Sequence, residues 1–138
     1  MAKLRYWPGG RLKYEYHASK GDERGLLKSW NKSGMVTEEF EIVGDSKDGL
    51  YIAYHGNGTI WIKCYYKKDV KDGEYKSFYP NLIPCVHCSY REGNVSGKFV
   101  SFHENGGKDL ECEFVDGKLR GKYTSWLSSG VVEKEAVY

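Results

Sequence analysis

The chain lacks the features that mark membrane, secreted and nucleic-acid-binding proteins. Its 138 residues contain no apolar run near the ~20 residues that a membrane-spanning helix needs, and residues 1–8 contain no apolar core of a secretory signal. The 21 Lys and Arg residues are balanced by 19 Asp and Glu residues, for a net charge of +2. A nucleic-acid binder needs basic residues that dominate and segregate. We therefore expect an intracellular, cytoplasmic protein with no nucleic-acid partner.

What is present is a pattern that restarts every 24 residues. Glycine recurs at this interval, at Gly25, Gly49, Gly73, Gly97 and Gly121. If this glycine is position 1 of a repeat, position 6 is always aromatic: Trp30, Tyr54, Phe78, Phe102 and Trp126, with Tyr6 before them. Fixed self-similarity of this kind is the signature of a stacked-repeat architecture. We predict a single domain, residues 1–138, with repeats at 1–24, 25–48, 49–72, 73–96, 97–120 and 121–138.

Each repeat is predicted to form a β-hairpin. Asn57-Gly58 and Asn105-Gly106 are typical of a tight turn that needs positive φ. After the turn, apolar residues alternate with polar ones, as in Ile62, Cys64 and Tyr66, which indicates a half-buried strand. No segment has the 3.6-residue periodicity of a helix. The predicted fold is all-β: an elongated, twisted, single antiparallel β-sheet, a meander of about twelve strands.

The strand before the turn is less regular. It carries aromatic residues at position 6 and also at position 3, where the series is Tyr51, Tyr75, Phe99 and Tyr123. A spacing of three breaks the alternation of a strand. Either a bulge intervenes or each face of the sheet carries one aromatic row.

Two runs carry a family resemblance, Gly-Glu-Tyr-Lys-Ser-Phe at residues 73–78 and Gly-Lys-Tyr-Thr-Ser-Trp at residues 121–126. With the six-fold period, they resemble the MORN repeat family, and most of all its variant subfamily from bacteria, protists and large DNA viruses, often described as an antitoxin component. The resemblance implies an elongated, twisted sheet that mediates protein contacts and often dimerises. Lipid binding is also attributed to the family, but this sequence contains no lipid motif. The family glycine between the two aromatics is replaced here by Cys64, Cys88 and Cys112.

These cysteines are predicted to be buried free thiols. Equivalent residues of successive hairpins lie about 9–10 Å apart, whereas a disulfide needs Cα atoms ~4.4–6.8 Å apart. Cys85-Val86-His87-Cys88 resembles half of a zinc site. Zinc needs four converging ligands, and residues 85 and 88 of a regular strand point to opposite faces. We therefore predict no metal and no cofactor.

Catalysis is not predicted. His55 and His103 share position 7 but lie two repeats apart, roughly 20 Å by strand spacing. No nucleophile–base–acid set and no glycine-rich phosphate loop is present, so we expect neither an enzyme nor a small-molecule substrate. The repeat at 73–96 has residues 79–84, Tyr-Pro-Asn-Leu-Ile-Pro, in place of a glycine turn. Because Pro84 cannot donate a ladder hydrogen bond, its strand should be bulged, kinked or shortened; Leu82 and Ile83 are either offered to a partner or a product of repeat drift.

The aromatic rows suggest the function. A hydrophobic sheet face must be buried against something, and a large exposed apolar patch usually marks an interaction site. We predict a non-enzymatic scaffold that binds a protein partner or a second copy, as a homodimer, through an aromatic-lined face; packing inside a curled sheet is the other possible role of these rows. Two further alternatives are an antitoxin-type neutralising protein and a peripheral membrane-binding module, which the balanced charge disfavours. The candidate binding residues are Trp30, Tyr54, Phe78, Phe102, Trp126, Tyr51, Tyr75 and Tyr123.

Overall fold

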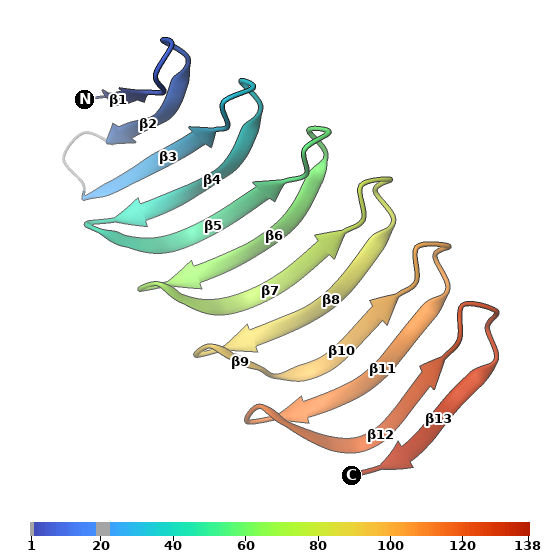
Figure 1. Cartoon of the computed structure of the whole chain (residues 1–138). Helices are drawn as coiled ribbons and strands as arrows, with labels where there is room; N and C mark the ends of the chain where they lie inside the picture. The colour runs from blue at the N-terminus through green and yellow to red at the C-terminus, as the bar shows by residue number, and fades with distance from the viewer. Residues whose placement is uncertain (1, 19–22) are drawn as a thin grey trace.

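The computed structural model describes residues 2–18 and 23–138, which are built from strands and turns (Figure 1). The described residues include no helix that could span a membrane. The strands are β1 (Ala2–Tyr6), β2 (Leu12–Ala18), β3 (Arg24–Trp30), β4 (Val36–Val43), β5 (Ser46–Tyr54), β6 (Ile60–Lys67), β7 (Val70–Phe78), β8 (Pro84–Arg91), β9 (Asn94–Val95), β10 (Gly97–Phe102), β11 (Lys108–Val115), β12 (Lys118–Trp126) and β13 (Val132–Val137).

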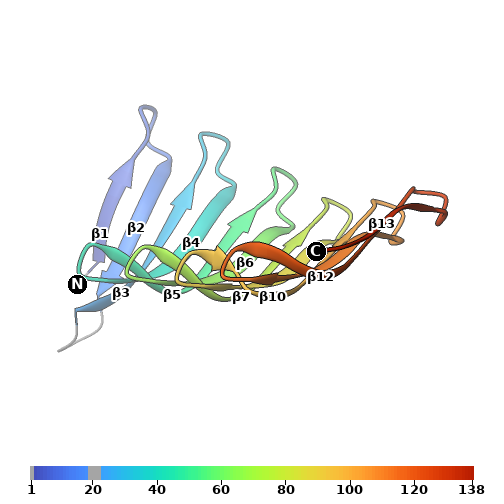
Figure 2. The ribbon, with the colours of Figure 1, turned by 90° about the horizontal axis from the view of Figure 1, so that it is seen from below.

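These strands form one open antiparallel sheet in chain order. The two-residue strand β9 pairs with β8 beside this path, and β10 takes the next place in the sheet. Figure 2 shows a single layer whose hairpin ends rise out of the plane of the other strands, without a second layer of described residues on either face. The predicted fold, an elongated and twisted meander of stacked hairpins, is confirmed.

Six turns of the same geometry close the hairpins. In each, the main-chain N–H at position 7 donates to the carbonyl at position 11, and the N–H at position 10 donates back to the carbonyl at position 7. In the repeat at 49–72 these bonds join His55 to Thr59 (2.8 Å) and Gly58 to His55 (2.9 Å). Gly58 and Gly106 have φ values of 86° and 89°, the left-handed conformation predicted for the Asn-Gly turns.

The repeat at 73–96 makes the same turn without glycine. Tyr79 donates to the carbonyl of Ile83 (2.8 Å), and Leu82 donates to that of Tyr79 (2.9 Å) with a φ of 70°. The sequence left a bulge, a kink or a shortening open for the strand at Pro84. The bulge is confirmed, because the register shifts between Ser77 and Phe78, the partner of Pro84, while β8 keeps the 8 residues of β6. The register shifts beside position 6 in the other hairpins as it does at Pro84. A bulge of this kind tolerates a residue without an N–H.

Candidate functional site

The pairing register assigns the side chains of the central strands to two faces. Cys64 lies opposite Tyr51 on one side and Tyr75 on the other, and paired residues of antiparallel strands share a face. We call the face that carries Cys64, Cys88, Cys112 and the residues paired with them the cysteine face. The opposite face, which we call the charged face, carries the row Lys63, Lys76 and His87.

The eight aromatic residues predicted as one surface lie on both faces. The Tyr51 hydroxyl donates to Glu38 (2.6 Å) and the Tyr54 hydroxyl to Glu39 (2.7 Å). Glu38 and Glu39 are neighbours in β4, so their side chains point to opposite faces. The cysteine face carries Tyr51, Tyr75 and Tyr123, and the charged face carries Trp30, Tyr54, Phe78, Phe102 and Trp126. Of the two possibilities left open by the sequence, one aromatic row on each face is confirmed, because the first strand alternates from position 3 to position 6 and the extra residue of the bulge lies on the partner strand. A role in binding stays a prediction.

A column of cysteines runs through the middle of the cysteine face. Cys64, Cys88 and Cys112 are only 1%, 3% and 3% exposed, and Cys64 is the largest fully buried side chain among the described residues. All three are free thiols. Burial raises the pKa of each thiol, that of Cys88 to about 11. A protonated, buried thiol is a poor nucleophile, so these cysteines act as small core residues.

Large and small side chains alternate across the cysteine face. Gly73, at position 1, lies opposite the position-18 residue Tyr90, whose ring packs edge-on against Tyr75 with centroids 5.5 Å apart. Such pairs stabilise a fold by about 0.5–1.5 kcal/mol beyond their buried area. The same arrangement occurs in four successive hairpins: Tyr51–Tyr66, Tyr75–Tyr90, Phe99–Phe114 and Tyr123–Tyr138. Tyr75 thus lies next to two small residues on its face, Gly73 of its own strand and Cys88 of the paired strand, which leave room for its ring.

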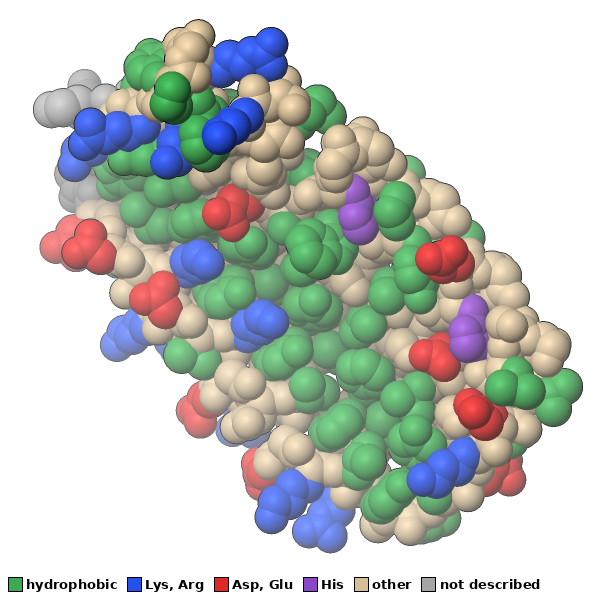
Figure 3. Space-filling view, viewed as in Figure 1, with side chains coloured by type: hydrophobic (Ala, Val, Ile, Leu, Met, Phe, Trp, Pro, Cys, Tyr) green, Lys and Arg blue, Asp and Glu red, His purple; other side chains and the backbone are tan. Residues whose placement is uncertain are grey.

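Lysine side chains lie over several of these rings. The Lys47 ammonium lies 5.1 Å from the ring centroid of Tyr51 and 5.3 Å from that of Tyr66. Lys71, one repeat further, lies 5.1 Å from the rings of both Tyr75 and Tyr90. A cation over an aromatic face is attracted by the ring quadrupole. Figure 3 shows the resulting surface, a continuous band of hydrophobic side chains along the sheet with basic and acidic groups at its margins.

Side-chain hydrogen bonds link the tips of neighbouring hairpins. The residue at position 7 reaches the main-chain carbonyl at position 6 of the next hairpin, as from His55 to Phe78 and from His103 to Trp126, both 2.7 Å. The donors of this ladder are Trp7, His55, Tyr79 and His103. Sequence reasoning missed this role, although a hydrogen-bonding side chain recurs at position 7. Both histidines are therefore used in holding hairpins together.

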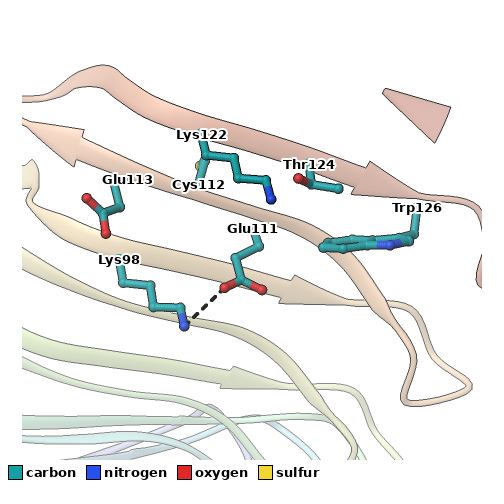
Figure 4. Close-up of a pocket in the computed structure, with 7 residues that line it drawn as sticks. All are labelled: Lys98, Glu111, Cys112, Glu113, Lys122, Thr124 and Trp126. Carbon is teal, nitrogen blue, oxygen red and sulfur yellow. Dashed lines mark ion pairs between the residues drawn. The ribbon is translucent and has the colours of Figure 1, made fainter. Parts of the chain in front are cut away.

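The charged face has a shallow pocket of about 390 Å³ near its C-terminal end (Figure 4). It is lined by Lys98, Glu111, Glu113, Lys122, Thr124 and Trp126 of the charged face, and it also borders Cys112, which belongs to the cysteine face. Lys98 forms an ion pair with Glu111 at 3.1 Å, and hydrogen bonds from Lys108 and Lys98 lower the pKa of the Glu111 carboxyl. Because opposite charges meet in its centre, the pocket has the character of a solvated, ion-paired surface.

The three possible zinc ligands of the segment at 85–88, Cys85, His87 and Cys88, lie in three different environments. Cys88 is buried in the cysteine column, whereas His87 is half exposed on the charged face, 3.9 Å from Glu74. Cys85 lies beside Tyr79, and a hydrogen bond between them raises the pKa of Tyr79 to about 12. Within the described ranges, no three His, Cys, Asp or Glu side chains converge as metal ligands would.

Comparison with known proteins identifies one hairpin directly. The MORN repeat variant family matches residues 47–68, which span most of β5 and all of β6. No curated protein sequence matches the chain. The other hairpins share the turn, the bulge and the aromatic positions of this one. The matched hairpin confirms the resemblance to the MORN repeat family.

Proposed function

We propose that this protein is a non-enzymatic repeat scaffold that binds a protein partner through its cysteine face. The observation that carries the proposal is the band of half-buried aromatic and aliphatic side chains along that face. A compact protein would cover such a band with a second layer of helices or strands. Here the described strands form one layer only, so the band is open to a partner along its whole length.

The exposed area supports this proposal. The accessible surface is 8898 Å², whereas a compact protein of this mass exposes about 7,300 Å². The excess, roughly 1,600 Å², is as large as the total surface buried in a standard protein–protein interface.

The distribution of reactive and charged groups supports the choice of face and of a non-enzymatic role. The cysteine thiols are buried and protonated, and the ring nitrogens of His55 and His103 bind main-chain carbonyls. The charged face carries ion pairs such as Lys98–Glu111 and Lys76–Glu74 (2.9 Å), which are typical of a solvated surface. An apolar band is the more favourable surface to bury.

The test compares two matched charge insertions. Leu110 and Val100 are half-buried residues of the same hairpin, on the cysteine face and the charged face respectively. Hydroxyl-radical footprinting of the protein, purified and in extract of its source cells, should reveal protection of cysteine-face tyrosines only in the extract. Leu110→Lys should abolish that protection and Val100→Lys should retain it, provided that both variants melt cooperatively.

Light scattering of the purified protein separates the two kinds of partner. A dimer that Leu110→Lys dissociates and Val100→Lys does not would identify a second copy as the occupant. A monomer that is protected only in extract would indicate a different protein. Equal footprints on the cysteine face in both samples, from a protein that is monomeric when purified, would refute the proposal.

A further inference from the structure

Two neighbouring hairpins present the same basic and aromatic unit on the cysteine face. Each unit consists of a lysine at position 23 and two tyrosine rings beneath its ammonium: Lys47 with Tyr51 and Tyr66, and Lys71 with Tyr75 and Tyr90. Neither lysine forms an ion pair with any described residue. Two acidic side chains lie next to the first unit, and both have other partners: Asp69 accepts a hydrogen bond from the main-chain N–H of Lys47 at 2.7 Å, and Glu38 accepts one from the Tyr51 hydroxyl at 2.6 Å. Each unit therefore has a positive charge that lies over aromatic rings and is not neutralised by an ion pair with a described carboxylate.

Each unit also offers a hydroxyl donor. The hydroxyls of Tyr66 and Tyr90 make no hydrogen bond to another described residue, while that of Tyr51 is bound to Glu38. Burial raises the pKa of both Tyr66 and Tyr90, so their hydroxyls stay protonated at neutral pH. An ammonium and a hydroxyl beside an apolar surface suit an anionic group such as a carboxylate, since charge-assisted hydrogen bonds are the stronger kind.

The spacing of the units selects the conformation of a ligand. Lys47 and Lys71 occupy equivalent places two strands apart, which is about 9.6 Å at ~4.8 Å per strand. A polyproline II helix rises 3.1 Å per residue with three residues per turn, so its residues i and i+3 lie on one side about 9.3 Å apart. In a β-strand the same two residues span about 10 Å but point to opposite sides. Polyproline II segments also dock on aromatic-lined surfaces.

The next unit along the sheet differs. Val95 stands at position 23, and the ring pair is Phe99 and Phe114, 5.9 Å apart. With neither a lysine nor a hydroxyl, this unit suits an apolar side chain. The three units together specify two acidic residues and an apolar residue at successive third positions.

We propose that the cysteine face binds an acidic, proline-rich segment of a partner protein, in polyproline II conformation and lying across the strands. Its carboxylates at i and i+3 bind Lys47 and Lys71 with the hydroxyls of Tyr66 and Tyr90, and its residue i+6 packs against Phe99. This proposal rests on the proposed function and names the partner of the same face.

The experiment measures binding of fluorescein-labelled synthetic peptides to the whole protein by anisotropy. The probe is Glu-Pro-Pro-Glu-Pro-Pro-Leu-Pro-Pro; one comparison peptide replaces both Glu residues by Gln, and another has Glu-Pro repeats, which place the acids two residues apart. We expect the probe to bind at least tenfold more tightly than either, because a charge-assisted contact is lost in the first and the spacing in the second.

Two double variants with the same loss of charge test the site. Lys47→Gln with Lys71→Gln should weaken binding of the probe roughly tenfold or more, and Lys→Arg at both positions should restore most of it. Lys63→Gln with Lys122→Gln, two exposed lysines of the charged face, should change it less than about twofold, since surface charges act weakly at physiological salt. Thermal melts verify that each variant is folded.

Four outcomes would overturn the proposal. The probe does not bind, or the Glu-Pro peptide binds as tightly as the probe, or both double variants weaken binding of the probe equally. The fourth is that Lys47→Gln with Lys71→Gln abolishes binding to anionic vesicles and leaves binding of the probe unchanged. The footprinting result decides separately on the proposed function. If the cysteine face is protected in extract but the probe does not bind, the face has a partner of another chemistry. If neither occurs, both proposals fail.

Discussion

Replacing Cys64 by serine should destabilise the protein more than the same replacement at Cys85, the partly exposed cysteine. Cys64 is 1% exposed and lies between the rings of Tyr51 and Tyr75, which occupy the paired places on both neighbouring strands. Serine is nearly isosteric with cysteine, so the backbone and the rings need not move. What changes is the chemistry of one atom in an apolar site.

The expected loss follows from two contributions. Replacing the apolar sulfur sacrifices about 1 kcal/mol of transfer free energy, comparable to one buried methylene. Burying a hydroxyl without a partner costs about 1–3 kcal/mol. We expect the free energy of unfolding to fall by about 2–4 kcal/mol, and the midpoint of thermal unfolding by roughly 7–14 °C for a chain of this length.

The repeat geometry predicts how such losses combine. Cys64 and Cys88 both lie opposite Tyr75 and share it as a neighbour, whereas Cys64 and Cys112 share no neighbour. Distant sites usually add within about 0.5 kcal/mol, and sites with a common partner do not. The double variant at Cys64 and Cys112 should therefore lose the sum of the single losses, and the double variant at Cys64 and Cys88 should depart from the sum.

Urea and thermal unfolding, followed by circular dichroism under reducing conditions, measure all these quantities. Cys85→Ser is the matched control, because Cys85 is only half-buried and lies outside the column. The reasoning is refuted if Cys64→Ser changes the free energy of unfolding by less than about 0.5 kcal/mol, the range of ordinary surface substitutions. It is also refuted if Cys85→Ser costs as much.

Three further predictions concern pH, the hairpin tips and the free edge. Burial raises the pKa of Cys88 from its ordinary 9.0 to about 11; its contribution to stability is complete below pH 9 and lost as the pH rises towards 11, so unfolding midpoints should fall over that window and fall less in Cys88→Ala. His55→Ala leaves the carbonyl of Phe78 without its 2.7 Å partner and should cost about 1–2 kcal/mol in denaturant unfolding, whereas His87→Ala, half exposed, should stay within about 0.5 kcal/mol. If β1 of a second copy paired with β13 in the register of β3 with β2, Lys134 would face Arg5 of that copy, and the two positive charges would repel each other. Lys134→Glu replaces this repulsion by attraction, so light scattering should reveal oligomers that grow with concentration and that the unaltered protein does not form. Adding Arg5→Glu to this variant should reverse the association.

The hairpins and their order could be predicted from the sequence because they depend on side-chain patterns that the sequence displays. The Asn57-Gly58 turn needs positive φ, and the alternation through Ile62, Cys64 and Tyr66 needs a half-buried strand. The burial of the cysteine column also followed from its spacing. In each case the same physical requirement recurs every 24 residues, so that six weak signals reinforce one another.

The candidate site was predicted only in part. Position 6 falls on the charged face because the chain alternates from position 3, but the extra residue of the bulge lies on the partner strand, where the sequence does not mark it. The tip ladder was missed because its acceptors are main-chain carbonyls, which every residue has. The turn at Leu82 was unexpected because main-chain hydrogen bonds hold it in a left-handed conformation that usually selects glycine.

Each described hairpin pairs only with its immediate neighbours, so the length of the sheet is set by the number of hairpins. Residues 73–96 enter the sheet where Cys64 meets Tyr75 and leave it where Val86 meets Ser101, one period later in the same register. Removing those 24 residues would join β6 to β10 and shorten the sheet by about 9.6 Å, and duplicating them would lengthen it by the same step. The length of the sheet therefore changes only in steps of one hairpin. A partner that spans several hairpins must place its contacting groups at multiples of this step, which the strand spacing fixes.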